Sequence, residues 1–255
     1  MYSVGVTFYS LIAFDLDDTL APSKSPMPQR MARALSSLLD TTQVCIISGG
    51  QFSQFEQQVL NALTATEKQL ENLHLMPTCG TRYFIRRRET WENVYVRNLT
   101  DAERNDATIA LREEAEKLGL WENNPWGEVI EDRGSQITFS ALGQEAPLEK
   151  KREWDPTGEK KNILRTAVAK RLPTLEVRTG GSTSVDITRK GVDKAYGITE
   201  LSTVTEIPIA DMLFIGDRLD PDGNDYPVTR LGIATIHVSG WEETAEIIEK
   251  YLAKM

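Results

Sequence analysis

Histidine, cysteine and long apolar runs are scarce in this sequence, and each shortage excludes a class of protein. The two histidines, His74 and His237, are too few for a histidine-rich metal centre and make a histidine-based catalytic triad improbable. The two cysteines, Cys45 and Cys79, occur in apolar or turn contexts without metal-ligand spacing, which favours buried reduced thiols over a disulfide or a zinc site. No apolar run approaches the ~20 residues that a membrane-spanning helix needs.

An excess of basic residues is also missing. The formal net charge of -9 argues against nucleic acid or an anionic membrane as the main partner. Residues 1–8 carry no basic stretch followed by an apolar core, so no secretory signal is expected and cytoplasmic residence is the default. With 40% hydrophobic and 26% charged residues, the composition is that of an ordinary globular protein, and 255 residues suffice for one large or two modest domains.

The most informative stretch is an apolar run followed by two acids. Leu11–Phe14 reads as a buried strand, and Asp15 and Asp17 come directly after it. Open α/β sheets bind ligands at the carboxyl ends of their strands, so both acids are expected at the mouth of a cleft. Leu16 would point away from them in an extended backbone, which lets the two carboxylates share one face. Such a pair requires a cation such as Mg²⁺ before it can hold a phosphate.

The next segments continue a parallel α/β pattern. Apolar residues at helical spacing over 31–39 precede a second buried strand, Val44–Ile47, which ends in Ser48-Gly49-Gly50. A strand, a helix and a strand within ~30 residues form a βαβ unit with a right-handed crossover. Leu73–Met76 is expected to be a third strand.

The pattern changes over residues 83–187. Alternating segments, including 83–85 and 94–96, are typical of half-exposed antiparallel strands, and long helices are expected over 102–118 and 157–172. This composition predicts an inserted α+β domain. From residue 188 the strand-and-helix rhythm resumes, so the parallel core is expected to be discontinuous, comprising residues 1–82 and 188–255.

Four groups of polar residues follow core elements in order along the chain. They are Asp15 with Asp17, then Ser48, then Lys194, and finally Asp217 with Asn224 and Asp225. Phosphoryl transfer to a carboxylate nucleophile needs ligands for a metal ion, a cation, a hydroxyl and a second acid. These residues supply side chains of all four kinds. A glycosyltransferase acid motif would not predict Lys194. An EF-hand calcium loop is excluded because the twelfth position counted from Asp220 is Leu231.

These motifs resemble those of the haloacid-dehalogenase superfamily, with its Rossmann-like parallel-sheet core and inserted α+β cap. The resemblance implies that Asp15 is the nucleophile and Asp17 the general acid/base, while Ser48 and Lys194 bind the transferring phosphoryl group. Mg²⁺ would be held by Asp15, the backbone carbonyl of Asp17 and Asp217, with Asn224 and Asp225 in support. The sequence departs from many members at Asp18, where they have glycine.

A finer resemblance is to the eukaryotic-type phosphomannomutases. It rests on four segments of the sequence. They are Gly216-Asp217 followed by Pro221, Gly223, Asn224 and Asp225, then Gly191-Val192-Asp193-Lys194, Ser184-Val185-Asp186 and Asp132-Arg133. In that family a cap presents three arginines to the distal phosphate of a hexose phosphate; here the corresponding positions hold Arg133, Gln144 and Lys151. Ser184 and Asp186 would contact the sugar. Gln carries no charge and Lys cannot bind phosphate bidentately, so this clamp is weaker than the family's.

Three functions therefore remain open from the sequence. The first is a phosphomannomutase-like interconversion of mannose 6-phosphate and mannose 1-phosphate, and the second is a sugar-phosphate phosphatase that uses the same core residues. The third is a non-catalytic sugar-phosphate sensor, which predicts a broken nucleophile or metal site that the sequence does not have. By analogy with the family, a cap-mediated homodimer is also expected.

Overall fold

The computed structural model describes residues 8–255, and the chain divides into two compact units. Of the described residues, 8–96 and 193–255 form the core unit and 97–192 form the inserted unit. The fold is therefore a discontinuous α/β core that accepts an insertion between two of its elements.

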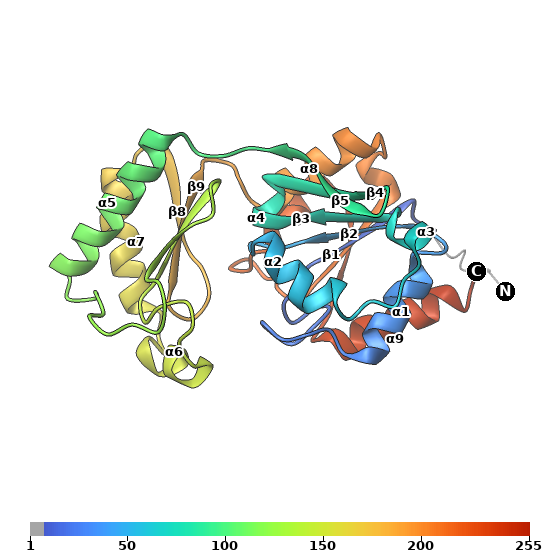
Figure 1. Ribbon diagram of the computed structural model, residues 1–255, viewed down its shortest axis with the longest axis horizontal. Helices are drawn as coiled ribbons and strands as arrows, with labels where there is room; N and C mark the ends of the chain where they lie inside the picture. Colours follow the sequence, from blue (N-terminus) through green and yellow to red (C-terminus); the bar gives the residue numbers. More distant parts are fainter. Residues whose placement is uncertain (1–7) are drawn as a thin grey trace. The chain divides into compact units, whose positions relative to one another are not determined.

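The core unit is built on a seven-stranded sheet with the order β11-β10-β1-β2-β3-β4-β5 (Figure 1). The first five strands in this order pair in parallel, and β4 and β5 add an antiparallel hairpin at one edge. The strands are β1 (Leu11–Phe14), β2 (Gln43–Ile47), β3 (Leu73–Met76), β4 (Arg82–Arg87), β5 (Thr90–Val96), β10 (Met212–Gly216) and β11 (Ala234–His237).

Both faces of the central strands are buried because helices cover each side. In β1, Ile12 and Phe14 pack into one apolar layer while Leu11 and Ala13 pack into the opposite one. The first layer includes the buried faces of α1 and α9, and the second includes Ile198 from α8. A strand buried on both faces must be apolar throughout, which is why Leu11–Phe14 is an unbroken apolar run.

The helical segments of the core unit range from single turns to twelve residues. They are α1 (Gln29–Leu38), α2 (Phe52–Phe55), the π-helical turn η1 (Glu56–Leu60), α3 (Glu67–Leu70), the short turn α4 (Pro77–Gly80), α8 (Lys194–Thr205), the 3₁₀ turns η2 (Ile209–Asp211) and η3 (Tyr226–Leu231), and α9 (Trp241–Leu252).

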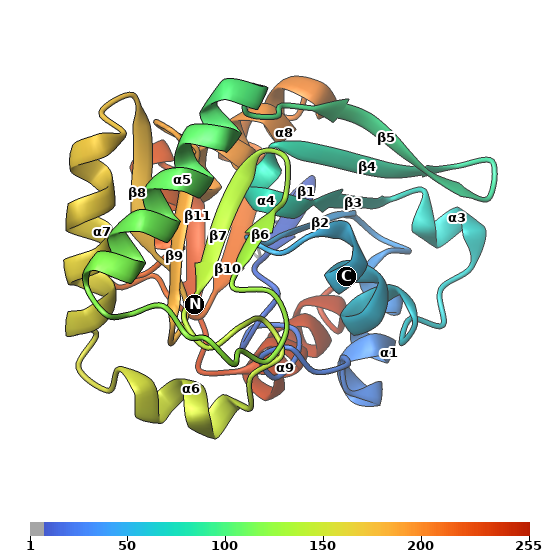
Figure 2. The same cartoon turned by 60° about the vertical axis from the view of Figure 1, so that its left-hand side comes forward.

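The inserted unit is a four-stranded antiparallel sheet with two long helices on one face (Figure 2). Its strand order is β6-β7-β9-β8. Residues such as Ile137, Phe139 and Val185 face the helices, and the alternate residues form a polar face. The elements are α5 (Asp101–Lys117), β6 (Ile130–Asp132), β7 (Gln136–Ser140), α6 (Leu148–Trp154), α7 (Glu159–Arg171), β8 (Leu175–Thr179) and β9 (Ser184–Arg189).

The hairpin of β4 and β5 belongs to the core unit, although the sequence assigned its residues to the insertion. His74 and Leu75 of β3 pair with Ile85 and Phe84 of β4, so the hairpin extends the core sheet. The divisions thus fall at 96/97 and 192/193, whereas the sequence analysis set them at 82/83 and 187/188. Alternation correctly indicated half-exposed strands, but it reports the exposure of a strand and not the sheet to which the strand belongs.

Gly197 of α8 lies against the turn α4, and we expect even one methyl group there to destabilise the core. A Cβ at Gly197 would lie 2.3 Å from Ile47 Cδ1 and 2.8 Å from the Cys79 carbonyl oxygen. We predict that Gly197→Ala lowers the free energy of unfolding by about 1–3 kcal/mol, measured by urea denaturation. Gly181→Ala is the matched control, because a Cβ there meets nothing within 4 Å. Equal midpoints for the two variants would contradict the prediction.

His74 makes the stability of the core unit sensitive to acid. Its Nδ1 lies 2.7 Å from the Tyr83 hydroxyl and its Nε2 lies 2.8 Å from Gln43 Oε1. In the neutral tautomer that fits this network, Tyr83 donates to Nδ1 and Nε2–H donates to Gln43. Burial lowers the pKa of His74 to about 4, from 6.5 in the unfolded chain.

The sign of this effect follows from proton binding. Between pH 6.5 and pH 4 the unfolded chain takes up a proton at His74 that the folded chain refuses, so stability is present above pH 6.5 and is lost as the pH falls. The full loss is on the order of 3 kcal/mol. We expect His74→Gln to flatten the dependence of the urea midpoint on pH across this interval. An unchanged slope would show that other groups carry the acid sensitivity.

Candidate active site

The candidate catalytic residues of the core unit gather at the carboxyl edge of the parallel strands. Phe14 of β1 pairs with Ile46 of β2 and with Ile215 of β10. The residues that follow these strands, Asp15 and the segments from Ser48 and Asp217, therefore leave the sheet side by side. This register explains why groups distant in the sequence meet at one edge of the sheet.

Three carboxylates form the centre of this site. One oxygen from each of Asp15, Asp217 and Asp225 lies within 4.8 Å of the other two. Asp15 and Asp225 are buried and Asp217 is half-buried. Oxygen ligands at such spacing are the donors that hard divalent cations such as Mg²⁺ and Ca²⁺ prefer.

Lys194 is the cation of the site. Its ammonium is 1% exposed and donates to Asp15 Oδ1 and, at 2.5 Å, to Asp225 Oδ1. Lys194 is the first residue of α8, and the preceding Asp193 caps that helix by accepting a hydrogen bond from the Tyr196 N–H. Burial alone would lower the pKa of Lys194, but the carboxylates of Asp15 and Asp225 outweigh burial and raise it.

The charges of this cluster do not balance without a further cation. Three carboxylates and one ammonium leave two negative charges if all are ionised. Burial raises the pKa of Asp15 to about 8, with Lys194 opposing the rise and Asp225 adding to it. Burial also raises the pKa of Asp217, and Asp225 again adds to the rise. A divalent cation matches both the donor set and the missing charge, so the residues present fit a metal ion.

The acidic loop after β10 is held in shape by two glycines. A Cβ at Gly216 would lie 2.4 Å from Asp225 Oδ2, and one at Gly223 would lie 1.9 Å from the Arg218 carbonyl oxygen. The Arg218 N–H donates to Asp225 Oδ2 at 3.1 Å. The loop thus folds back on Asp225, which explains how Asp217 and a residue eight positions later reach the same cluster.

Asn224 lies apart from the carboxylates that it was predicted to support. Its side chain is exposed, and no hydrogen bond in the part of the chain that the structure describes joins it to them. Asp225, next to it, is fully buried and bonds to Lys194. Spacing alone could not tell which of two neighbouring loop residues points inward.

The Asp17 carboxylate is held by neighbouring residues and is not one of the three clustered carboxylates. It accepts hydrogen bonds from Gln54 Nε2 at 2.9 Å, from Gln58 Nε2 at 3.1 Å and from the Lys24 N–H at 2.8 Å. The metal role predicted for Asp17 concerned its backbone carbonyl and not its carboxylate, and that role stays a prediction. The adjacent Asp18 has a φ of 60°, a left-handed conformation that Asp tolerates better than most residues, so the departure from glycine keeps the turn.

Ser48 is buried at the end of β2 in a loop that is bonded to the turn α4. Its hydroxyl oxygen accepts from the Gly50 N–H at 3.2 Å, which leaves the O–H as a donor for a ligand oxygen. The Thr78 N–H donates to the Gly50 carbonyl and the Cys79 N–H donates to the Ser48 carbonyl, both at 2.9 Å. Thr78 and Cys79 have left-handed φ values of 48° and 54°, a strained conformation for non-glycine residues.

In the inserted unit, three of the predicted substrate residues belong to the polar side of the sheet. Asp186 pairs with Thr138 across β9 and β7 and accepts a 2.8 Å hydrogen bond from its hydroxyl. Ser184 lies two residues earlier on the same strand. Burial raises the pKa of Asp186, and the nearby charge of Arg133 opposes that rise. Arg133 also donates twice to Glu131, at 2.7 and 3.0 Å.

Gln144 and Lys151 form a second, separate contact in that unit. The buried Lys151 ammonium donates to the Gln144 backbone carbonyl at 2.7 Å. The sequence predicted both positions to be part of a phosphate clamp. That role stays a prediction, and in this structure the Lys151 ammonium is bonded to a backbone carbonyl.

Several residues of the site were not found from the sequence. Gln54 and Gln58 hold Asp17, and the Thr19 hydroxyl donates to Asp217 Oδ1 at 3.4 Å. Gln54 and Gln58 are four positions apart, about one helical turn. This spacing could have indicated that their side chains lie on the same face of a helix.

Solved structures of other proteins are similar to this fold over most of the chain. A haloacid dehalogenase-like hydrolase from Bacteroides thetaiotaomicron is similar in structure, with a TM-score of 0.63, 15% identity, and coverage of 95% of this chain and 99% of that one. An IMP-nucleotidase from Plasmodium falciparum is similar with a TM-score of 0.71 and 18% identity, covering 97% of this chain and 70% of that one. The sheet order and the acids at its carboxyl edge define a haloacid-dehalogenase-like protein.

Within that class, the chain belongs to the eukaryotic phosphomannomutase family, whose model matches residues 31–254. A phosphomannomutase from Saccharomyces cerevisiae is 24% identical over 225 residues, covering 86% of this chain and 84% of that protein. The finer resemblance inferred from the sequence is thus confirmed.

None of the helices within residues 8–255 has both the length and the apolar composition needed to cross a membrane.

Proposed function

We propose that this protein is a Mg²⁺-dependent phosphotransferase that interconverts mannose 6-phosphate and mannose 1-phosphate through an aspartyl-phosphate. The observation that carries the proposal is the cluster of Asp15, Asp217 and Asp225 around the buried ammonium of Lys194. Membership of the phosphomannomutase family supports the choice of substrate.

The three clustered carboxylates would hold the metal ion. When bound, Mg²⁺ supplies the positive charge that allows an anionic phosphoryl group to approach an anionic nucleophile. The two uncompensated negative charges of the metal-free cluster support this assignment, because they would otherwise repel a phosphate.

Asp15 acts as the nucleophile in this proposal. One of its carboxylate oxygens forms a bond to phosphorus as the bond from phosphorus to the leaving oxygen breaks, which produces the aspartyl-phosphate. The Ser48 hydroxyl and the Lys194 ammonium donate to the phosphoryl oxygens as these gain charge. In the mutase cycle the phosphorylated Asp15 donates its phosphoryl group to the free hydroxyl of the sugar phosphate. The resulting bisphosphate turns around, and its other phosphoryl group is transferred to Asp15.

Asp17 moves the proton in this proposal. It gives a proton to the leaving oxygen and later removes one from the attacking hydroxyl. The amides of Gln54 and Gln58 fix the orientation of its carboxylate.

The inserted unit would provide substrate specificity as a cap. Arg133 and Lys151 would bind the distal phosphate, Gln144 would contribute an amide, and Ser184 and Asp186 would contact sugar hydroxyls. A homodimer formed through this unit remains a prediction from the family.

One observation favours a second candidate, a sugar-phosphate phosphatase. Arg133 is paired with Glu131 and Lys151 is bonded to a backbone carbonyl, so both cations that would bind the distal phosphate already have partners. A weak hold on that phosphate would allow a bisphosphate intermediate to escape and water to accept the phosphoryl group.

A single assay separates these functions. The protein is incubated with Mg²⁺, a hexose bisphosphate primer and a panel of hexose phosphates, and both isomer interconversion and inorganic phosphate are measured. The proposal predicts interconversion of the mannose phosphates that stops when EDTA removes the metal. Release of phosphate without interconversion would identify a phosphatase, and no turnover in either channel would identify a sensor.

A further inference from the structure

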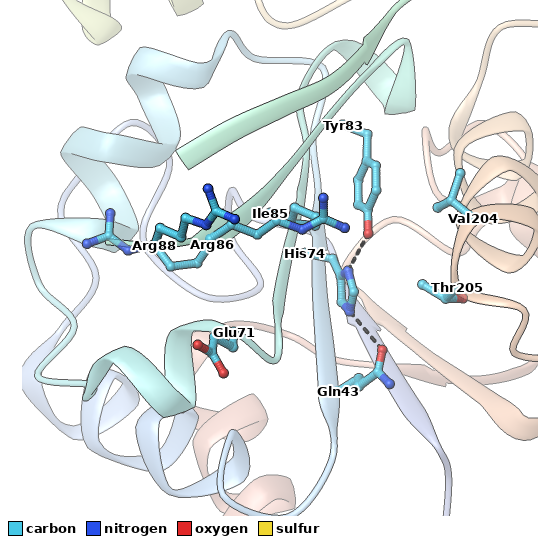
Figure 3. Close-up of a pocket in the computed structure, with 10 residues that line it drawn as sticks. Gln43, Glu71, His74, Tyr83, Ile85, Arg86, Arg88, Val204 and Thr205 are labelled. Atoms are coloured by element: carbon cyan, nitrogen blue, oxygen red, sulfur yellow. Dashed lines mark hydrogen bonds between the residues drawn. The ribbon is translucent and has the colours of Figure 1, made fainter. Parts of the chain in front are cut away.

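A pocket of about 520 Å³ opens in the core unit, away from the catalytic carboxylates (Figure 3). Gln43 lines it and is the first residue of β2, whereas Ser48 follows the last residue of that strand. Because the neighbouring strands run in parallel, the pocket lies toward their amino ends and the acidic cluster at their carboxyl ends. The pocket is lined by Gln43, Glu71, His74, Tyr83, Ile85, Arg86, Arg87, Arg88, Val204 and Thr205.

One part of the pocket is uncharged. His74 and Tyr83 are buried and bonded to each other, and His74 is bonded in turn to Gln43. Ile85 and the exposed Val204 add apolar surface. This wall offers apolar contact and a few polar groups, which is the usual composition of a small-molecule site, and the volume falls within the usual range of about 300–1,000 Å³.

Another part of the pocket is cationic. Arg86, Arg87 and Arg88 are consecutive residues at the end of β4 and the start of its hairpin turn. Arg86 is fixed by a bidentate pair with Glu67, at 2.8 and 2.9 Å. Among the described residues, Arg87 has one ion pair, with Glu92 at 3.6 Å, and both side chains are well exposed. Arg88 makes no ion pair with any residue in 8–255, and Glu71 is the one carboxylate among the ten lining residues.

The two parts lie on different sides of His74. Figure 3 places Arg86 and Arg88 on one side and Val204 and Thr205 of α8 on the other. An occupant that uses both would carry negative charge at one end and an uncharged, partly apolar body at the other. Arginine favours phosphate-like groups because its planar guanidinium can bind them through two hydrogen bonds.

We propose that this pocket binds a small phosphate ester whose organic part is a compact ring. The phosphate lies against Arg87 and Arg88, and the ring lies against Ile85, Val204 and the His74–Tyr83 pair. Nothing in the proposed phosphotransferase mechanism uses these residues, so the site is independent of that mechanism.

Phenylphosphonate tests the proposal, because it carries the charge and the ring and cannot be hydrolysed. Methylphosphonate is the comparison probe, since it has the charge without the ring. Binding to the full-length protein with Mg²⁺ is followed by amide hydrogen exchange. We expect phenylphosphonate to protect the amides of β4 and of the last turn of α8, and methylphosphonate to require at least ~10-fold higher concentration.

Two variants and one control assign the protection to the pocket. The first variant combines Arg87→Ser with Arg88→Ser and removes the two cations. The second variant, Val204→Glu, places a carboxylate on the apolar wall. All three positions are exposed, so both variants should fold. Each change is expected to raise the phenylphosphonate concentration needed for protection at least ~10-fold. Arg33→Ser, at an exposed position of α1, should leave it unchanged. Absence of protection at these segments, equal protection in the arginine variant, or equal affinity for both probes would overturn the proposal.

Discussion

Asp15→Asn is expected to abolish phosphoryl transfer while leaving the fold intact. The amide oxygen of asparagine can still accept from Lys194, so the buried ammonium keeps both of its partners. An amide, however, is not a competent nucleophile toward phosphorus. We expect kcat for mannose phosphate interconversion to fall on the order of 10⁴-fold or more. The covalent phosphoryl group should also disappear, measured as acid-stable, hydroxylamine-sensitive label on the protein.

The control for Asp15→Asn is a neighbouring acid that the site does not use. Asp222 is exposed in the acidic loop, so Asp222→Asn removes a charge of the same sign without touching the three clustered carboxylates. Its kcat should stay within about 3-fold of the parent value, because a solvated charge acts weakly at a distance. Retention of label by Asp15→Asn would show that another residue carries the phosphoryl group.

Lys194→Met is expected to reduce both stability and activity. The ammonium is the cation that the described side chains place against Asp15 and Asp225, and it is almost completely buried. Removing one partner from a buried ion pair leaves uncompensated charge, which costs about 3–5 kcal/mol. We expect the free energy of unfolding to fall by that amount in urea denaturation and kcat to fall on the order of 10³-fold, because a donor to the phosphoryl oxygens is lost.

Magnesium distinguishes a charge effect from a packing effect in this variant. If uncompensated carboxylate charge destabilises Lys194→Met, Mg²⁺ should raise its unfolding midpoint more than it raises that of the parent. Lys190→Met, at an exposed position, is the control and should show neither effect. A variant as stable as the parent, with no greater response to Mg²⁺, would contradict the electrostatic account of the cluster.

The parts of the fold that the sequence predicted are those where burial dictates residue type. Leu11–Phe14 is apolar because helices cover both faces of β1, and the long helices over 102–118 and 157–172 agree closely with α5 and α7. The hairpin of β4 and β5 was misplaced because an edge hairpin has the same alternation in either unit. Its sheet is decided by pairing with β3, a long-range choice that local pattern does not encode.

The candidate site also has residues that the sequence indicated and contacts that it did not. Order along the chain predicted that Asp15, Ser48, Lys194 and Asp217 belong to one site, because the carboxyl ends of parallel strands lie at the same edge of a sheet, and their catalytic roles stay predictions. The roles of Asp225 and Asn224 depend on how one loop folds back over Gly216 and Gly223, and spacing did not reveal that Asp225 would bond to Lys194. In the inserted unit, Lys151 was assigned from position, and its bond to a backbone carbonyl could only be seen in three dimensions.

The point at which the insertion returns to the core unit has a mechanical consequence. The inserted unit ends at Val192, and Lys194 begins α8 two residues later. Asp193, between them, is tied to the Tyr196 N–H and to Arg230 Nη2, at 3.0 and 2.7 Å. These two ties anchor the chain just ahead of the ammonium, so the start of α8, and with it the backbone of Lys194, is held in place from within the core unit.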